Sequence, residues 1–139
     1  MSVKFQPMPL LKRAAPFNHT DWLFELKYDG FRSLAVIEHG RAQLISHNGH
    51  PFASFTELGK QIAASVPNAR AVIDGEICSL DRRGRSQFKN SMFRRGIPPC
   101  FFAFDLVTCE GKDLRAERLL DRKQELRRLL AKTSPPFPL

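Results

Sequence analysis

The feature that most constrains the fold is a series of short apolar segments separated by glycine turns. Residues 22–28 and 31–38 are rich in aromatic and aliphatic side chains, and an Asp-Gly pair at 29–30 divides them. A third segment, residues 41–46, follows a His-Gly pair at 39–40. Apolar runs bounded by such turns are typical of strands joined as hairpins. The pattern therefore predicts an antiparallel meander.

Helix and strand signals then alternate. Ser54 and Glu57 have the spacing of a capping box, and apolar residues recur at helical intervals from Phe55 to Val66. The segments expected next are a strand at 71–80, a turn at 81–84, a short helix at 86–95, a central buried strand at 101–109, and a helix at 115–131 with an inner stripe of Leu119, Leu126 and Leu130. This order predicts an α+β fold with a mixed, largely antiparallel sheet and packed helices.

The length of 139 residues fits one domain. Residues 1–20 contain three prolines and are expected to be an extended lead-in, residues 21–132 the domain, and residues 133–139 a proline-rich tail. The sequence has no apolar run long enough for a membrane helix and no secretory signal pattern. We therefore expect a cytoplasmic protein with no membrane partner, associated with the nucleoid if the source is bacterial.

The charge balance favours a polyanionic partner. The chain has 22 Lys and Arg against 14 Asp and Glu, a net charge of +8. Residues 82–95 contain six basic side chains and no acidic one, and a nucleic-acid surface and a solvated hairpin explain them equally well. The six are Arg82, Arg83, Arg85, Lys89, Arg94 and Arg95. The basic C-terminal helix is interpreted as a solvated face, and the three cysteines lack the spacing of a zinc site.

Three short segments contain side chains suited to catalysis or ligand binding. In a strand, Glu25 and Lys27 would share one face, where a partly desolvated lysine can act as a nucleophile or simply keep an edge strand soluble. Asp74 and Glu76 would likewise share a face, opposite Ile73 and Ile77. They could bind a divalent cation or ribose hydroxyls, or they could be solvated acids.

A third candidate segment is Phe101-Phe-Ala-Phe-Asp105. Its rings either fill the core or, at the end of a strand, stack on a base. The residues alone leave both alternatives open.

The order and spacing of these segments resemble a known family. Lys-x-Asp-Gly-x-Arg at 27–32, Asp-Gly-Glu at 74–76 and Phe-Asp at 104–105 resemble the nucleotidyltransferase domain of ATP-dependent DNA ligases. The residues in and around these motifs are most similar to those of the bacterial end-joining ligases, and the resemblance covers about residues 20–131. It implies part of an ATP-grasp-like nucleotidyltransferase domain.

The resemblance also implies roles for single residues. Lys27 matches the nucleophile that forms a covalent adenylate with ATP, and Glu25 matches the position near the adenine. Arg32 and Glu76 match groups at the ribose, and Phe104 matches the ring that stacks on the base. Glu76 is also expected to help place Mg²⁺. The implied substrate is nicked or broken double-stranded DNA in repair and recombination.

Two departures from the family pattern stand out. Residues 46–49 read Ser-His-Asn-Gly where the family usually has Ser-Arg-x-Gly, which weakens a phosphate contact. The 139 residues do not contain the later Glu-Gly and Lys-x-Lys motifs or the OB-fold domain. We therefore expect sealing by this chain alone to be impaired unless a second chain supplies those motifs. A catalytically dead nucleic-acid-binding fragment and an RNA ligase or capping-type nucleotidyltransferase remain alternatives.

Overall fold

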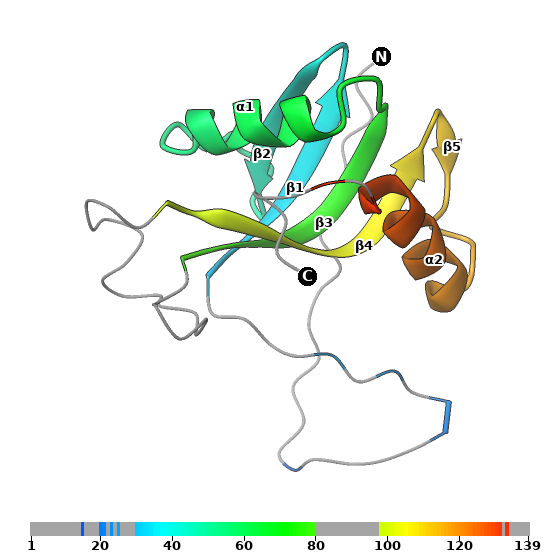
Figure 1. The fold of residues 1–139 in the computed structure, drawn as a ribbon. Helices are drawn as coiled ribbons and strands as arrows, with labels where there is room; N and C mark the ends of the chain where they lie inside the picture. Colours follow the sequence, from blue (N-terminus) through cyan, green and yellow to red (C-terminus); the bar gives the residue numbers. More distant parts are fainter. Residues whose placement is uncertain are drawn as a thin grey trace.

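The computed structural model describes residues 15, 20, 21, 23, 25, 30–79, 98–131 and 133. The elements in this part of the chain are β1 (Phe31–Glu38), β2 (Arg41–Ser46), α1 (Thr56–Ser65), β3 (Ala71–Cys78), β4 (Cys100–Cys109), β5 (Lys112–Asp113) and α2 (Leu119–Leu130). The strands form one sheet in the order β2-β1-β3-β4-β5, and every neighbouring pair is antiparallel (Figure 1). This confirms the α+β fold class.

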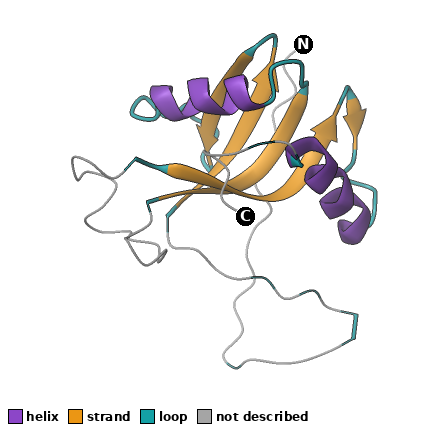
Figure 2. Ribbon diagram, viewed as in Figure 1, coloured by secondary structure: helices purple, strands orange, loops and turns teal. Residues whose placement is uncertain are grey.

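The β1–β2 hairpin forms where the turn residues predicted it. His39 and Gly40 adopt positive φ angles of 52° and 71°, which the tight turn between two antiparallel strands requires. The connection from α1 to β3 is also short (Figure 2). Helix α1 ends at Ser65, and its C-cap Val66 is followed directly by Pro67. Proline cannot continue a helix, so it accounts for this end.

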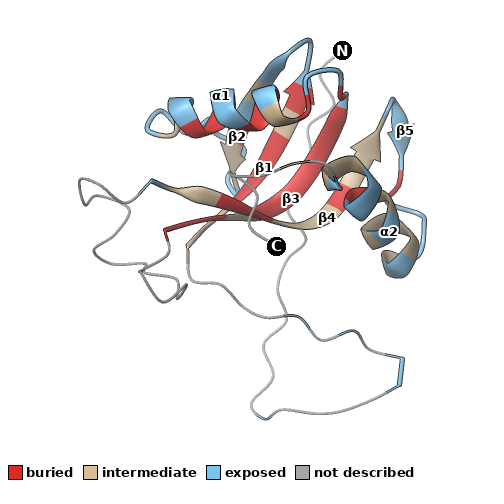
Figure 3. Ribbon diagram, viewed as in Figure 1, coloured by how far each residue is buried: buried red, intermediate tan, exposed pale blue. Residues whose placement is uncertain are grey.

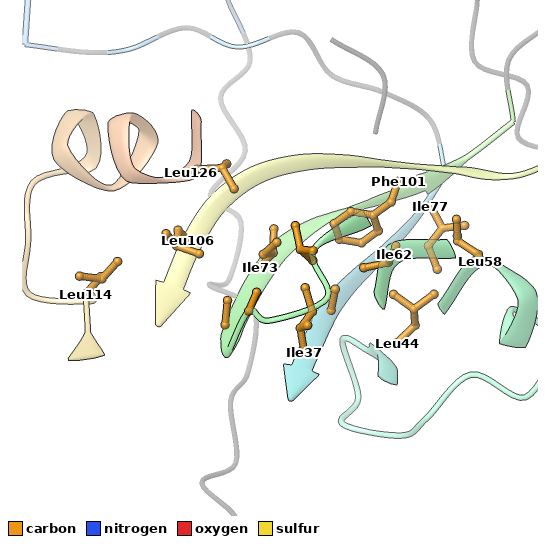
Figure 4. Packing of buried hydrophobic residues seen from close by; sticks show 14 residues of the cluster. Ile37, Leu44, Leu58, Ile62, Ile73, Ile77, Phe101, Leu106, Leu114 and Leu126 are labelled. Atoms are coloured by element: carbon orange, nitrogen blue, oxygen red, sulfur yellow. The ribbon is translucent and has the colours of Figure 1, made fainter. Parts of the chain in front are cut away.

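The core lies between the sheet and the two helices. Buried residues of α1, β1 and β3 lie along this side of the molecule (Figure 3). Leu58 and Ile62 of α1 pack in the same apolar cluster as Ile73 and Ile77 of β3, and Leu126 joins it from α2 (Figure 4). Each of these side chains is at most 6% exposed. Burying one large aliphatic side chain contributes about 1.5–3 kcal/mol, so this cluster is the main source of stability in the described part.

Helix α1 lies unusually close to the outer edge of β2. A Cβ atom on Gly59 would lie 2.8 Å from the carbonyl oxygen of Ala42, so only glycine permits this approach. Further along the edge, the Phe52 amide donates to the Leu44 carbonyl at 2.9 Å, and Pro51 bridges to Ile45. The outer edge of β2 is thereby covered.

Both helices begin differently from the prediction. The capping box at Ser54 is wrong, because the N-cap of α1 is Phe55 and has no side-chain cap; the Thr56 hydroxyl bonds instead to the Ala53 carbonyl at 3.5 Å. Helix α2 begins at Leu119, later than expected. The residues before it form a turn in which the Arg115 amide donates to the Asp113 carboxylate at 3.0 Å.

The central strand of the sheet is β3, not the predicted 101–109 segment. Strand β4 has only the two-residue β5 on its outer side, and most of its residues are half-buried. Register shifts in its pairing with β3 interrupt the regular alternation of its side chains between the two faces. Strand β5 is too short to show any periodicity in the sequence.

Several predictions concern other segments. The predicted strand at 22–28 includes Leu23 and Glu25, and neither lies in a strand; the rest of that range lies outside the described residues. The turn at 81–84 and the short helix at 86–95 also lie outside them. The domain boundaries remain predictions. Within the described residues, no helix is both long and apolar enough to cross a membrane.

Candidate functional site

The face of the sheet opposite the core carries charged side chains. Ile73 and Ile77 of β3 point into the core, so Asp74 and Glu76 point to the other face. The register pairs Glu76 with Arg32 of β1 and Asp74 with Asp105 of β4. Side chains from three strands, far apart in sequence, therefore meet on one surface, which we call the charged face.

Arg32 and Asp74 form the central ion pair of the charged face. The Arg32 Nε and Nη2 atoms donate to the two Asp74 carboxylate oxygens at 3.2 and 2.6 Å. Both side chains are largely shielded, with 22% and 10% exposed. The hydrogen bond to Asp74 raises the pKa of Arg32, helped by the charges of Glu76 and Asp105. Asp74 is therefore not a solvated acid; it fixes the direction of the Arg32 guanidinium.

Phe104 and Asp105 lie at a β-bulge in β4. Gly75 pairs with Ala103 and Asp74 with Asp105, so Phe104 has no partner on β3. A bulge of this kind bends the strand and redirects side chains, and it is common beside functional sites. Along β4, Phe104 and Asp105 are flanked by Ala103 and Leu106, which pack in the core. The register places Phe104 and Asp105 together at the edge of the charged face.

Helix α2 holds both bulge residues from outside the sheet. Arg122 donates through Nε and Nη2 to the Asp105 carboxylate at 2.8 and 3.0 Å. The next residue, Lys123, donates through Nζ to the Phe104 carbonyl at 2.6 Å and also forms an ion pair with Glu25. The Asp105 hydrogen bond raises the pKa of Arg122, and burial lowers the pKa of Lys123.

Sequence reasoning missed Arg122 and Lys123. The basic α2 helix was interpreted as solvated, yet these two side chains are only 13% and 19% exposed. The available signal was their position between Leu119 and Leu126 on the inner stripe of the helix. Basic residues beside such a stripe can reach a carboxylate on the strand that the helix covers.

The structure brings together the described members of the predicted site only in part. Arg32 and Glu76 are register partners, and Phe104 is connected to Glu25 through Lys123. Lys27 and the six basic residues of the 82–95 segment lie outside the described residues. Their predicted roles remain predictions.

The two glycines of the predicted motifs have a packing role. A Cβ on Gly30 would lie 2.2 Å from the Ile77 carbonyl oxygen, and one on Gly75 would lie 2.3 Å from the Phe102 carbonyl oxygen. Distances this short exclude any side chain at these positions. Glycine in both motifs therefore follows from the close approach of β1, β3 and β4.

The described carboxylates do not form a metal site by themselves. Within the described ranges, no three His, Cys, Asp or Glu side chains gather closely enough to hold an ion. Asp74 and Asp105 already accept hydrogen bonds from arginines. Mg²⁺ usually binds one or two carboxylates together with substrate phosphates and water, so its binding does not require a cage of three protein ligands.

One cavity among the described residues lies away from the charged face. It has a volume of about 860 Å³ between α1 and β2, and its wall includes Phe52, Phe55 and Ala63. This wall is mainly apolar, and it contains none of the charged-face residues. The charged face is therefore the better candidate for chemistry that involves phosphates.

Cys100 lies on β4 opposite Cys78, and its thiol donates to the Cys78 carbonyl at 3.3 Å. Burial raises the pKa of Cys100 to about 11 from 9.0. Since only the thiolate reacts, we expect iodoacetamide at pH 8 to modify Cys100 about a hundredfold more slowly in the folded chain than in urea. Peptide mapping over time measures both rates, and equal rates would contradict the buried thiol.

Comparison with known proteins identifies the family. Residues 7–138 match the model of the ATP dependent DNA ligase domain. The chain belongs to this family of DNA ligase domains. The multifunctional non-homologous end joining protein LigD of Pseudomonas aeruginosa is 35% identical over 114 residues, which are 79% of this chain and 14% of that protein. LigD of Mycobacterium tuberculosis is 32% identical over 125 residues, which are 89% of this chain and 16% of that protein.

Solved ligase domains have the same fold. The mycobacterial DNA ligase D complexed with ATP and MES has a TM-score of 0.75 and 32% identity, over 83% of this chain and 38% of that one. The ligase domain of M. tuberculosis LigD has a TM-score of 0.74 and 32% identity. These matches confirm the resemblance stated for residues 20–131. The chain spans about a sixth of the length of these two LigD proteins and less than half of the solved domain.

Proposed function

We propose that this ligase domain forms a covalent adenylate on Lys27 as the first step of DNA strand sealing. The observation that supports it is the charged face, where Arg32 and Glu76 are register partners and Phe104 stands at a bulge beside them. A nucleotide needs a cationic group, hydroxyl acceptors and an aromatic ring, and these three residues offer them on one surface.

In the proposed reaction, the Lys27 amine attacks the α-phosphorus of ATP. The new P–N bond forms as the bond to pyrophosphate breaks, and the amine loses its proton, leaving a Lys27–AMP phosphoramidate. Mg²⁺ would neutralise the phosphate charge during this displacement. The adenylyl group would then pass to the 5′-phosphate of a DNA break, and the neighbouring 3′-hydroxyl would displace AMP.

The residues of the charged face have separate roles in this proposal. Arg32, held by Asp74, would bind the ribose side of the nucleotide with a guanidinium that needs no reorientation. Glu76 would accept a hydrogen bond from ribose or bind the metal. Phe104 would stack on the base, and Glu25 would contact the edge of the adenine. The basic residues of 82–95 would bind the DNA backbone.

The test is intact-mass measurement after incubation with ATP and Mg²⁺. Because the chain spans only part of its relatives, the experiment has two arms: this chain alone, and this chain with a second chain that supplies the remaining part of a LigD ligase domain. The second chain lacks the segment that contains Lys27, so any adduct with the mass of one adenylyl group lies on this chain. We expect the adduct in the mixed arm.

No adduct in either arm, from a sample with a cooperative thermal transition, would overturn the proposed reaction. Salt-sensitive DNA binding in that sample would then favour a nucleic-acid-binding module without catalysis. If the adduct forms, competition between nicked DNA and nicked RNA identifies the preferred strand break. Preferred transfer to RNA would contradict the DNA assignment.

A further inference from the structure

The two sides of the proposed base pocket come from segments that are distant in sequence. Glu25 precedes β1, whereas Phe104 lies in β4, and neither residue is a register partner of the other. A pocket built from such segments needs a connection that keeps their spacing constant. In the described part of the chain, one side chain contacts both residues: Lys123 of α2.

Lys123 is placed to make this connection for structural reasons. The bulge leaves the Phe104 residue without a partner on β3, and its carbonyl accepts from Lys123 Nζ at 2.6 Å. Only 19% of the Lys123 side chain is exposed, so its ammonium group has exchanged most of its water for these protein contacts. A shielded ammonium needs such partners, because an unpaired buried charge is strongly unfavourable.

The neighbouring arginine fixes the position of Lys123. Arg122 binds both oxygens of Asp105 and also donates to the Glu117 carbonyl at 2.6 Å, where the chain enters α2. Leu126, one turn further, is buried in the core. The helix is therefore anchored on both sides of Lys123, which fixes the point on α2 from which its side chain extends.

We propose that Lys123 is a positioning residue of the nucleotide site, which holds Glu25, at the edge of the base, and the backbone of Phe104, at its face, at a fixed spacing. This inference rests on the proposed function, because the roles of Glu25 and Phe104 belong to it. Lys123 touches neither the α-phosphate nor the reacting amine in this scheme. Its loss should therefore weaken recognition of the base more than the chemical step.

The experiment measures adenylate formation against ATP concentration for Lys123→Met, which keeps the length and apolar stem but removes the charge. We expect the KM for ATP to rise about tenfold, kcat to change less than about threefold, and the preference for ATP over GTP to fall. Lys123→Arg should recover most of the loss, because its guanidinium can donate to both partners. The matched control is Lys60→Met on α1, whose side chain contacts Glu57 at the surface.

The outcomes separate this inference from the proposed function. An active wild-type chain whose Lys123→Met variant has an unchanged KM and base preference would overturn the positioning role alone. A Lys123→Arg variant as impaired as Lys123→Met would do the same. If Lys123→Met does not fold, Lys123→Gln, which keeps a donor for the Phe104 carbonyl, is measured instead. A wild-type chain that forms no adduct refutes the proposed function first.

Discussion

Lys27→Arg is expected to abolish the covalent adenylate, with a rate at least about a thousandfold below that of the unchanged chain. The guanidinium keeps the positive charge of lysine, so attraction of the triphosphate is retained. It stays protonated at any accessible pH and has no lone pair for attack on phosphorus. We therefore expect the Lys27→Arg variant to bind ATP but not to form the P–N bond.

The measurement is intact mass over time in the mixed arm described above, with ATP binding measured by calorimetry on the same samples. Lys60→Arg is the matched control, because Lys60 is an exposed lysine on α1. Its adduct should form at the unchanged rate. An adduct of normal yield on the Lys27→Arg chain would locate the nucleophile elsewhere and remove the central residue of the proposal.

Gly75→Ala is expected to destabilise the fold by at least about 3 kcal/mol, a large share of the roughly 5–15 kcal/mol that holds a domain folded. The added Cβ would lie 2.3 Å from the Phe102 carbonyl oxygen and 2.6 Å from the Phe101 ring. The carbonyl belongs to the neighbouring strand and the ring is fully buried. The carbonyl cannot move without separating β3 from β4, and the buried ring cannot move without disturbing the core around it.

Urea unfolding followed by circular dichroism measures this loss, and absence of a cooperative transition would also agree with it. The control is Gly49→Ala in an exposed turn. Gly49 has a φ of 81° and no neighbouring atom within 4 Å, so alanine there meets only backbone strain, about 1 kcal/mol. A Gly75→Ala chain as stable as the Gly49→Ala chain would contradict the close packing of β3 and β4.

The hairpin, α1 and β3 could be predicted because their signals are local. Turn residues at 39–40 and apolar residues at regular intervals are enough to define these elements. The face shared by Asp74 and Glu76 also follows from simple alternation along one strand. The sequence similarity of the three motifs then indicated the family, which the comparison confirmed.

The parts that could not be predicted depend on contacts between distant segments. The Arg32–Asp74 ion pair joins residues 42 positions apart, and nothing in either motif indicates which carboxylate Arg32 binds. The bulge at Phe104 depends on the pairing of β4 with β3, and the order of the strands makes β3 central, which the apolar run at 101–109 could not indicate. The inward direction of Arg122 and Lys123 depends on where α2 contacts the sheet.

Because of the bulge, the pairing between β3 and β4 does not involve Phe104. Ala103 already faces Gly75 and Asp105 already faces Asp74, so a chain lacking this one residue would keep these two pairs, and only the second irregularity, between Val72 and Ile73, would remain. Phe104 is thus one extra residue of β4 at a point where β3 already has its pairing partners. The side chain at position 104 can consequently be exchanged without a change in the register of β3 and β4.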